Sequence, residues 1–125
     1  MRARLGAFEP NVDVFVDEEA HRVVVLVEVA GAEPESLRVG FEERSLIVAG
    51  RRIEPARLRR GSFVQKEIVH GEFFRRIALP VAIEYEGAAA SYDDGLLAIV
   101  APIATTAYMP TARTELHVIV RRTHS

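Results

Sequence analysis

Few residues of this chain are arranged for catalysis or metal binding. Asp93 and Asp94 could form a carboxylate pair for acid–base chemistry. Adjacent residues on a two-residue turn point apart and stay solvated, so the turn explains both better than catalysis does. The four histidines lack the spacing of metal ligands, and no acidic side chains cluster with them. They are His21, His70, His117 and His124. The eight glycines are single and dispersed, without a phosphate-binding loop. We therefore expect no catalytic residue, no metal site and no cofactor.

Charge and composition also exclude several partners. The one basic cluster could bind nucleic acid and consists of Arg51, Arg52, Arg57, Arg59 and Arg60. No aromatic residues interleave with it and the formal net charge is −2, so a solvated loop is the better interpretation. The absence of cysteine excludes disulfides and thiol catalysis. Without a signal peptide or an apolar run of membrane-spanning length, we expect a cytoplasmic protein that binds neither nucleic acid nor membrane.

The last apolar stretch of the chain is the most informative segment. Leu116, Val118 and Val120 alternate with other residues, as in a β-strand with one apolar face. The preceding residues, 102–115, carry no hairpin signal that would pair this strand with its neighbour. A lone strand needs another sheet edge or groove, on its own subunit or on a different one, and the residues alone leave both possibilities open.

The elements that must receive this strand are themselves short strands. Alternating or valine-rich runs separated by turn residues occur at 12–16, 21–29, 37–41, 45–50, 73–79, 85–92 and 96–100. Asp94-Gly95 between two such runs is a strong hairpin signal. A single helical turn is expected at 33–36, and a long exposed loop begins at Arg51. This pattern predicts an all-β protein, an antiparallel, immunoglobulin-like β-sandwich of seven to eight strands.

Four motifs in a fixed order resemble the small heat shock proteins and their α-crystallin domain. They are Pro10–Phe15, Val29–Val39 (with Ala30 where the family usually has proline), Gly71–Pro80 and Ala90–Ile99. The last is the most specific: an alanine is followed, after three to four variable residues, by glycine, an apolar residue and leucine. Its hairpin residues are Ala90, Asp94, Gly95 and Leu97. The resemblance covers roughly residues 10–102 and the tail.

The resemblance implies a binding site for the tail. Val118 and Val120 match the family's C-terminal tripeptide, which docks into an apolar groove of a neighbouring subunit. Leu116 and Val118 satisfy the same pattern, so two registers are open, and we favour Val118 with Val120. The implied groove lies between Leu37–Phe41 and Ala88–Tyr92, with inward residues Val39, Phe41, Ala88 and Ala90. We expect docking between subunits rather than onto the tail's own domain.

The loop from Arg51 to Val69 is implied to build dimers. In similar bacterial and plant proteins a short strand from this loop pairs with the second strand of the partner. Phe63 and Val64 are the best match for that strand, and would pair with the segment that contains Val12 and Val14. Arg75 matches a family arginine near the dimer contact, with Glu67 as a candidate acidic partner.

These matches imply three regions and one function. We expect a short N-terminal arm at 1–9, an α-crystallin domain at 10–102 and a C-terminal extension at 103–125 that carries the Val-x-Val anchor. The implied function is non-enzymatic: an ATP-independent chaperone that self-associates and binds unfolding client proteins. The short arm, with Leu5, Ala7 and Phe8 as its apolar content, predicts smaller assemblies and reduced client capacity. The alternative is a p23-like co-chaperone or assembly adaptor, expected to be monomeric. A sandwich enzyme or sugar binder remains remote.

Overall fold

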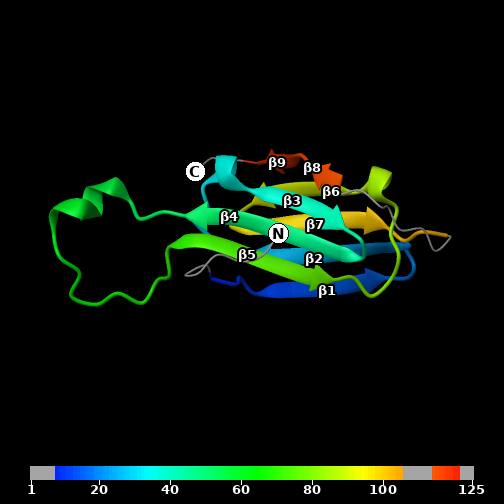
Figure 1. Cartoon of the computed structure of the whole chain (residues 1–125), viewed down its shortest axis with the longest axis horizontal. Helices are drawn as coiled ribbons and strands as arrows, with labels where there is room; N and C mark the ends of the chain where they lie inside the picture. The colour runs from blue at the N-terminus through cyan, green and yellow to red at the C-terminus, as the bar shows by residue number, and fades with distance from the viewer. Residues whose placement is uncertain (1–7, 106–113, 122–125) are drawn as a thin grey trace.

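The computed structural model is a two-layer β-sandwich with a long loop projecting from one end (Figure 1). It describes residues 8–105 and 114–121. Seven strands lie between Val12 and Pro102, which confirms the predicted sandwich, and the tail adds two more. Helical residues in the described part form only short 3₁₀ turns: η1 (Pro34–Ser36), η2 (Ala56–Arg60) and η3 (Tyr85–Gly87).

The first sheet has the strand order β1-β2-β7-β6-β9. Its strands are β1 (Val12–Asp17), β2 (Arg22–Glu28), β7 (Leu96–Pro102), β6 (Ala89–Asp93) and β9 (Val118–Val120). On β2 the alternate residues Val23, Val25 and Val27 are buried, while Val24 and Leu26 on the other face are half-buried. Burial of each valine contributes roughly 1.5–3 kcal/mol, which makes β2 the apolar centre of this layer.

The second sheet has the order β5-β4-β3-β8. Its strands are β5 (Gly71–Ala78), β4 (Ser45–Arg52), β3 (Arg38–Glu42) and β8 (Thr114–Leu116). All strand pairs in both sheets are antiparallel except β6 with β9, which is parallel. The predicted apolar face of β3 is correct, because Leu37, Val39 and Phe41 are all buried in the core between the layers.

Two local predictions differ from the structure. The expected strand at 85–92 begins later, because Tyr85–Gly87 forms η3 and only Ala89–Asp93 pairs with β7. The predicted start of the exposed loop at Arg51 is wrong, because β4 continues through Arg52, which lies opposite Gly71 of β5. Both arginines have backbone and side-chain partners that keep them in the sheet, as described below, so they belong to the sandwich rather than to a solvated loop.

Candidate tail-binding groove and self-association surfaces

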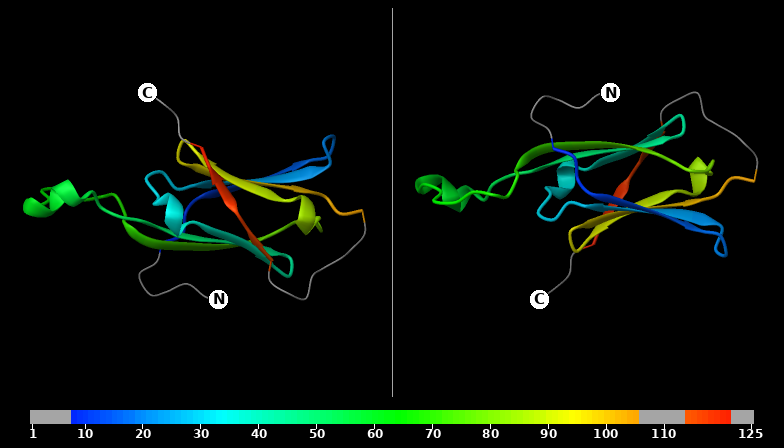
Figure 2. Two further views of the ribbon diagram at one scale, coloured as in Figure 1. Left: turned by 90° about the horizontal axis from the view of Figure 1, so that it is seen from above. Right: turned by 90° about the horizontal axis from the view of Figure 1, so that it is seen from below.

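The tail lies across the open side of the sandwich and joins both sheets. Figure 2 shows β8 and β9 running obliquely between the two layers. β8 pairs with β3, so that Leu116 lies opposite Val39. β9 pairs with β6, so that Val118 lies opposite Ala90. The predicted single strand 116–120 is therefore split: it passes from one sheet to the other at His117.

The tail's side chains alternate as a strand requires. Leu116, Val118 and Val120 are half-buried and pack against the core, whereas His117 and Ile119 are exposed. The two registers considered from sequence therefore use different walls: Leu116 lies on β3, and Val118 with Val120 lies on β6. In this single chain the groove belongs to the tail's own domain, whereas we expected the groove of another subunit. Docking between subunits stays a prediction.

Three of the expected groove residues, Val39, Phe41 and Ala90, lie opposite residues of the tail strands. Val39, Phe41 and Ala90 are buried, and Ala88 is half-buried at the entry to β6. Small alanines on the β6 wall leave space for the two valines of β9. An open pocket of about 330 Å³ remains between the tail and η1, lined by Pro34, Glu35, Leu37, Arg38, Leu116, His117, Val118 and Val120.

Two tyrosines that the sequence did not single out hold the groove strands in place. The Tyr92 hydroxyl donates to the carbonyl of Val29 at 2.8 Å and accepts from the amide of Ala32 at 3.2 Å. Tyr85 packs edge-to-face on Phe41 with ring centroids 5.1 Å apart, and its hydroxyl donates to the carbonyl of Glu43 at 2.6 Å. Both tyrosines lie in a run that alternates like a strand, and this pattern does not indicate hydrogen bonds to backbone groups distant in sequence.

The motif hairpin fixes the position of β6. Asp94 and Gly95 form the two-residue loop with φ of 52° and 79°, which matches a type I′ turn. A Cβ on Gly95 would stand 3.1 Å from both Cα and Cβ of Ala30. Gly95 therefore serves the turn and a close approach of two chain segments at once. Ala90 and Leu97, on the strands that flank it, are buried.

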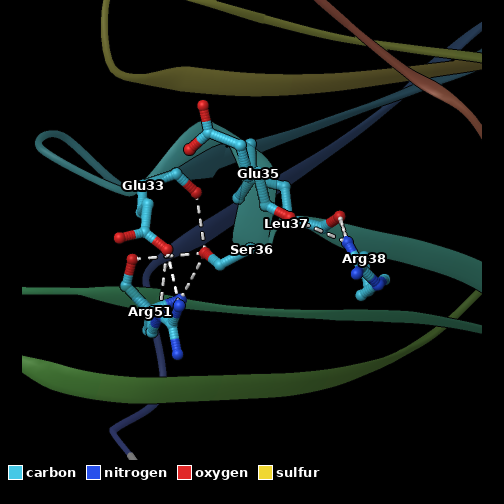
Figure 3. A network of polar contacts seen from close by, with 6 residues as sticks. All are labelled: Glu33, Glu35, Ser36, Leu37, Arg38 and Arg51. Carbon is cyan, nitrogen blue, oxygen red and sulfur yellow. Dashed lines mark hydrogen bonds and ion pairs between the residues drawn. The ribbon is translucent and has the colours of Figure 1, made fainter.

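A polar network ties η1 to β4 (Figure 3). Arg51 donates through Nε and Nη2 to Oε1 of Glu33, at 3.0 and 2.7 Å. The Ser36 hydroxyl donates to the carbonyl of Glu33 at 2.7 Å and accepts from the amide of Arg51 at 2.9 Å. These contacts position the turn that leads into β3, one wall of the groove.

The loop between β4 and β5 carries apolar side chains that its own domain does not cover. Phe63 is 48% exposed and Val64 is fully exposed. Ile68 and Val69 are exposed as well. No strand forms at Phe63–Val64 in this chain; the resemblance requires a partner strand there, so the expectation stays a prediction.

The base of this loop is held by polar contacts. Arg52 donates to the carbonyl of Val69 at 2.9 and 2.6 Å. Lys66 forms an ion pair with Glu54 at 2.8 Å, and its Nζ lies 3.2 Å from Nδ1 of His70. The hydrogen bond from Lys66 is the largest cause that lowers the pKa of Glu54. The loop thus projects from a fixed base with its apolar residues uncovered.

The other residues expected at a dimer contact lie near β1, whose outer edge has no partner strand among the described residues. Val12 is half-buried against the core and Val14 is 41% exposed. Arg75 donates to the carbonyl of Pro10 at 2.9 Å, and Glu67 accepts from Gln65. Arg75 and Glu67 are not paired within this chain.

Residue Phe8, assigned to the N-terminal arm, has a structural role that the sequence did not predict. It pairs with Phe73 on the edge of β5, and the two rings lie 5.6 Å apart. The guanidinium of Arg52 lies 4.7 Å from the centre of the Phe8 ring. The sequence feature that could have indicated this role is an aromatic residue close to Pro10. Residues 1–7 of the arm, among them Leu5 and Ala7, lie outside the described part.

Metal-ligand clusters and membrane-spanning helices are both absent from the described part. Within it, no three His, Cys, Asp or Glu side chains are grouped to hold a metal ion. No helix of the described residues is long and apolar enough to cross a membrane.

Comparison with known proteins gives one consistent result. The model of the Hsp20/alpha crystallin family matches residues 14–117. A search of the curated proteins found no match. Among solved structures, heat shock protein 16.0 from Schizosaccharomyces pombe has a TM-score of 0.73 at 25% identity, covering 81% of this chain and 71% of that one. The hspA from Xanthomonas axonopodis has a TM-score of 0.69 at 26% identity, covering 80% and 98%.

A small heat-shock protein from Xylella fastidiosa is 31% identical with a TM-score of 0.63, covering 81% of this chain and 93% of that one. The family model spans most of the sandwich together with the start of the tail. Fold, motifs and relatives therefore agree, and the chain belongs to the Hsp20/alpha crystallin family of small heat shock proteins.

Proposed function

We propose that this protein is an ATP-independent holdase, which binds partly unfolded proteins through apolar surface and prevents their aggregation. The observation that carries this proposal is the groove between β3 and β6, an apolar surface filled by a separate segment of chain. Membership of a family of small heat shock proteins supports it. The cytoplasmic location expected from the sequence stays a prediction.

The tail contact is weak enough for the tail to cover the groove reversibly. β8 and β9 have three residues each, and the three aliphatic side chains that they insert are only half-buried. Full burial of such a side chain is worth roughly 1.5–3 kcal/mol, and ordering of the tail offsets part of this. The tail can therefore leave the groove without unfolding the sandwich. Its departure would uncover two sheet edges and the apolar wall between them.

Self-association is the second part of the proposal. Phe63 and Val64 of one subunit would pair with the segment around Val12 and Val14 of another, which would cover the exposed loop residues and the open edge of β1. Glu67 would then come close to Arg75 of that partner. Tails docked between dimers would build larger assemblies. The small heat-shock protein from Xylella fastidiosa has a distinct high order structure, which supports assembly as a family trait.

Light scattering of a heat- or reduction-sensitive client tests the holdase activity. We expect suppression of aggregation at a stoichiometric ratio, with no change on addition or removal of ATP. The function that we propose is non-enzymatic. If the folded protein leaves client aggregation unchanged at stoichiometric and tenfold higher ratios, the holdase function is wrong.

The p23-like adaptor is the alternative, and the exposed loop argues against it. An adaptor of that kind is expected to be monomeric, and it has no reason to keep the fully exposed Val64 on a projecting loop. Native mass distinguishes the two: the holdase requires at least a dimer.

A further inference from the structure

The outer face of the first sheet carries an apolar strip that stays accessible in this chain. We propose that this strip binds unfolded client segments in which a short apolar run is flanked by basic residues. The inference rests on the proposed holdase function, and it adds a second surface and a class of client. The strip is separate from the groove, because its side chains point away from the core.

The register of the strands brings the strip together. Paired residues on neighbouring strands place their side chains on the same face of a sheet. Phe15 of β1 lies opposite Val24 of β2. Val24 also lies opposite Val100 of β7, which in turn lies opposite Ala89 of β6. One apolar row therefore crosses four strands of the sheet.

A second apolar row lies beside the first. It contains Leu26 of β2 and Ala98 of β7, which are paired. In the first row Phe15 is 60% exposed, and on β2 and β7 the side chains of both rows are half-buried rather than buried. Four strands spaced by about 4.8 Å make the strip about 14 Å wide, which is the length of about four extended residues. A short apolar run of an unfolded chain fits this width.

Strand β2 has the sequence of a strand that is covered on both faces. An antiparallel strand with one solvated face normally alternates apolar and polar residues. All residues from Val23 to Val27 are apolar instead, although only Val23, Val25 and Val27 face the core. Accessible apolar patches with a polar rim mark interaction sites. The outward side chains of Val24 and Leu26 therefore indicate a partner that covers them.

The outer face of the second sheet shows that the sandwich does not require such a strip. Ile47 of β4 is an outward residue that lies between Gly40 and Arg76 in the register. It is only 2% exposed, and Arg76 forms an ion pair with Glu42 at 3.3 Å. One sheet thus covers its outward aliphatic residue within the chain, whereas the other leaves the ring of Phe15 in solvent.

The charges around the strip indicate the class of partner. The outward charged side chains of β1, β2, β7 and β6 are four carboxylates and one guanidinium: Asp13, Asp17, Glu28, Asp93 and Arg22. Arg22 pairs with Asp17 at 3.7 Å, and the other three carboxylates have no cationic partner within the described residues. An excess of negative charge attracts lysine and arginine and disfavours acidic segments.

A second copy of this chain is a poorer partner for the strip. Two copies packed face to face through this sheet would bring the same carboxylates together, and such like-charge contacts cost free energy. A client segment with lysine or arginine beside its apolar run would place cations near Asp13 and Glu28 instead. The charge pattern therefore favours a basic client over self-association through this face.

Two synthetic peptides test both the surface and the class of client. Each contains the same short run of leucine, valine and phenylalanine, flanked on both sides by lysines in one peptide and by glutamates in the other. Fluorescence anisotropy measures their binding to the wild-type protein. We expect the lysine peptide to bind about fivefold more tightly, and the difference to vanish in about 0.5 M sodium chloride.

Variants of the outer face locate the binding. Phe15→Ser should weaken both peptides by about five- to tenfold, because it removes the most exposed large side chain of the strip. Val100→Thr, away from the edge of β1, should weaken both as well. Asp13→Asn with Glu28→Gln should remove most of the preference for the lysine peptide. Ile53→Ser, at a 52% exposed residue after β4, is the matched control and should leave binding unchanged.

Several results would overturn the proposal. They are no binding of either peptide, tighter binding of the glutamate peptide, and equal affinity of the wild type, Phe15→Ser and Val100→Thr. Native mass is measured for each variant, and a loss of self-association with unchanged peptide binding would overturn it in favour of a second copy. The aggregation assay separates the proposed function: suppression of aggregation without peptide binding at the strip contradicts the strip alone, whereas a lack of suppression contradicts the holdase.

Discussion

Two segments of this chain carry exposed or half-exposed apolar residues, and they differ in one respect. The tail places Leu116, Val118 and Val120 against the core of its own domain. The loop between β4 and β5 leaves Phe63 and Val64 in solvent. We propose both segments as elements of self-association, yet of the two only the tail packs its apolar side chains against the core of the same chain.

This difference indicates two kinds of association. A segment satisfied in its own subunit gains little free energy by moving to another, so its exchange depends on concentration. A segment that exposes half of a phenylalanine and a full valine side chain gains the burial energy of that remaining surface when a partner covers it. The loop contact should therefore be the stronger one, and the tail contact the adjustable one.

The largest effect is expected from the loop. Phe63→Ser together with Val64→Ser should weaken the dimer by about 3–5 kcal/mol, or roughly 100- to 4000-fold in dissociation constant. The unfolding of the monomer should change little, because neither side chain is buried in its own subunit. Sedimentation velocity over a dilution series measures the change. Leu58→Ser, at another exposed position of the loop, is the control, and an equal loss in both would contradict the assignment.

The next effect concerns the sandwich on which both segments depend. Gly95→Ala should lower the free energy of unfolding by about 1–3 kcal/mol, because the turn needs positive φ and an added Cβ would stand only 3.1 Å from Ala30. Gly61→Ala is the matched control, since no atom lies within 4 Å of the added Cβ. Chemical denaturation compares the two. Equal stability of both variants would show that the hairpin does not limit the fold.

The tail should show a smaller effect that is confined to docking. Val118→Ala with Val120→Ala removes half-buried methyl groups worth about 1.5 kcal/mol in total, or about tenfold in docking. We expect large assemblies to shift toward dimers and hydrogen exchange of β6 to rise. Ile119→Ala, which removes a 54% exposed side chain between them, is the control. Unchanged assembly and exchange in the double variant would contradict tail docking.

The smallest effect is a loosening of the loop base in acid. The hydrogen bond from Lys66 lowers the pKa of Glu54 from 4.5. A carboxyl group whose pKa is lowered by folding stabilises the structure above its unfolded pKa, and this contribution is lost as pH falls through the folded pKa. NMR signals of Lys66 and His70 should therefore shift below about pH 4.5 in wild type and lose this step in Glu54→Gln. Glu67→Gln, in the same loop, should keep it.

Much of the sandwich could be predicted because local signals and tertiary packing agree. The alternation at 37–41, the valines of β2 and the Asp94-Gly95 turn each identify an element that the structure contains. The run 85–92 failed because η3 interrupts it, and a period of two does not reveal a 3₁₀ turn at its start. Arg51 and Arg52 were misplaced because their partners, Glu33 and the carbonyl of Val69, are distant in sequence.

The groove was predictable only in part. The resemblance predicted its wall residues. The split of the tail between two sheets could not be predicted from the sequence, because the alternation of apolar residues continues unbroken through His117. The hydroxyl of Tyr92 and the ring of Phe8 depend on contacts between separate segments, which a single sequence does not specify. Whether a tail docks on its own or another subunit stays a prediction, because no motif specifies it.

The native mass of the wild-type protein over a dilution series tests the central claim most directly. Because the loop needs a partner and the tail does not, larger assemblies should dissociate to a dimer that persists at micromolar concentration. Native mass spectrometry resolves these species. A folded monomer at every concentration would show that the loop's apolar residues need no partner, and would contradict the account.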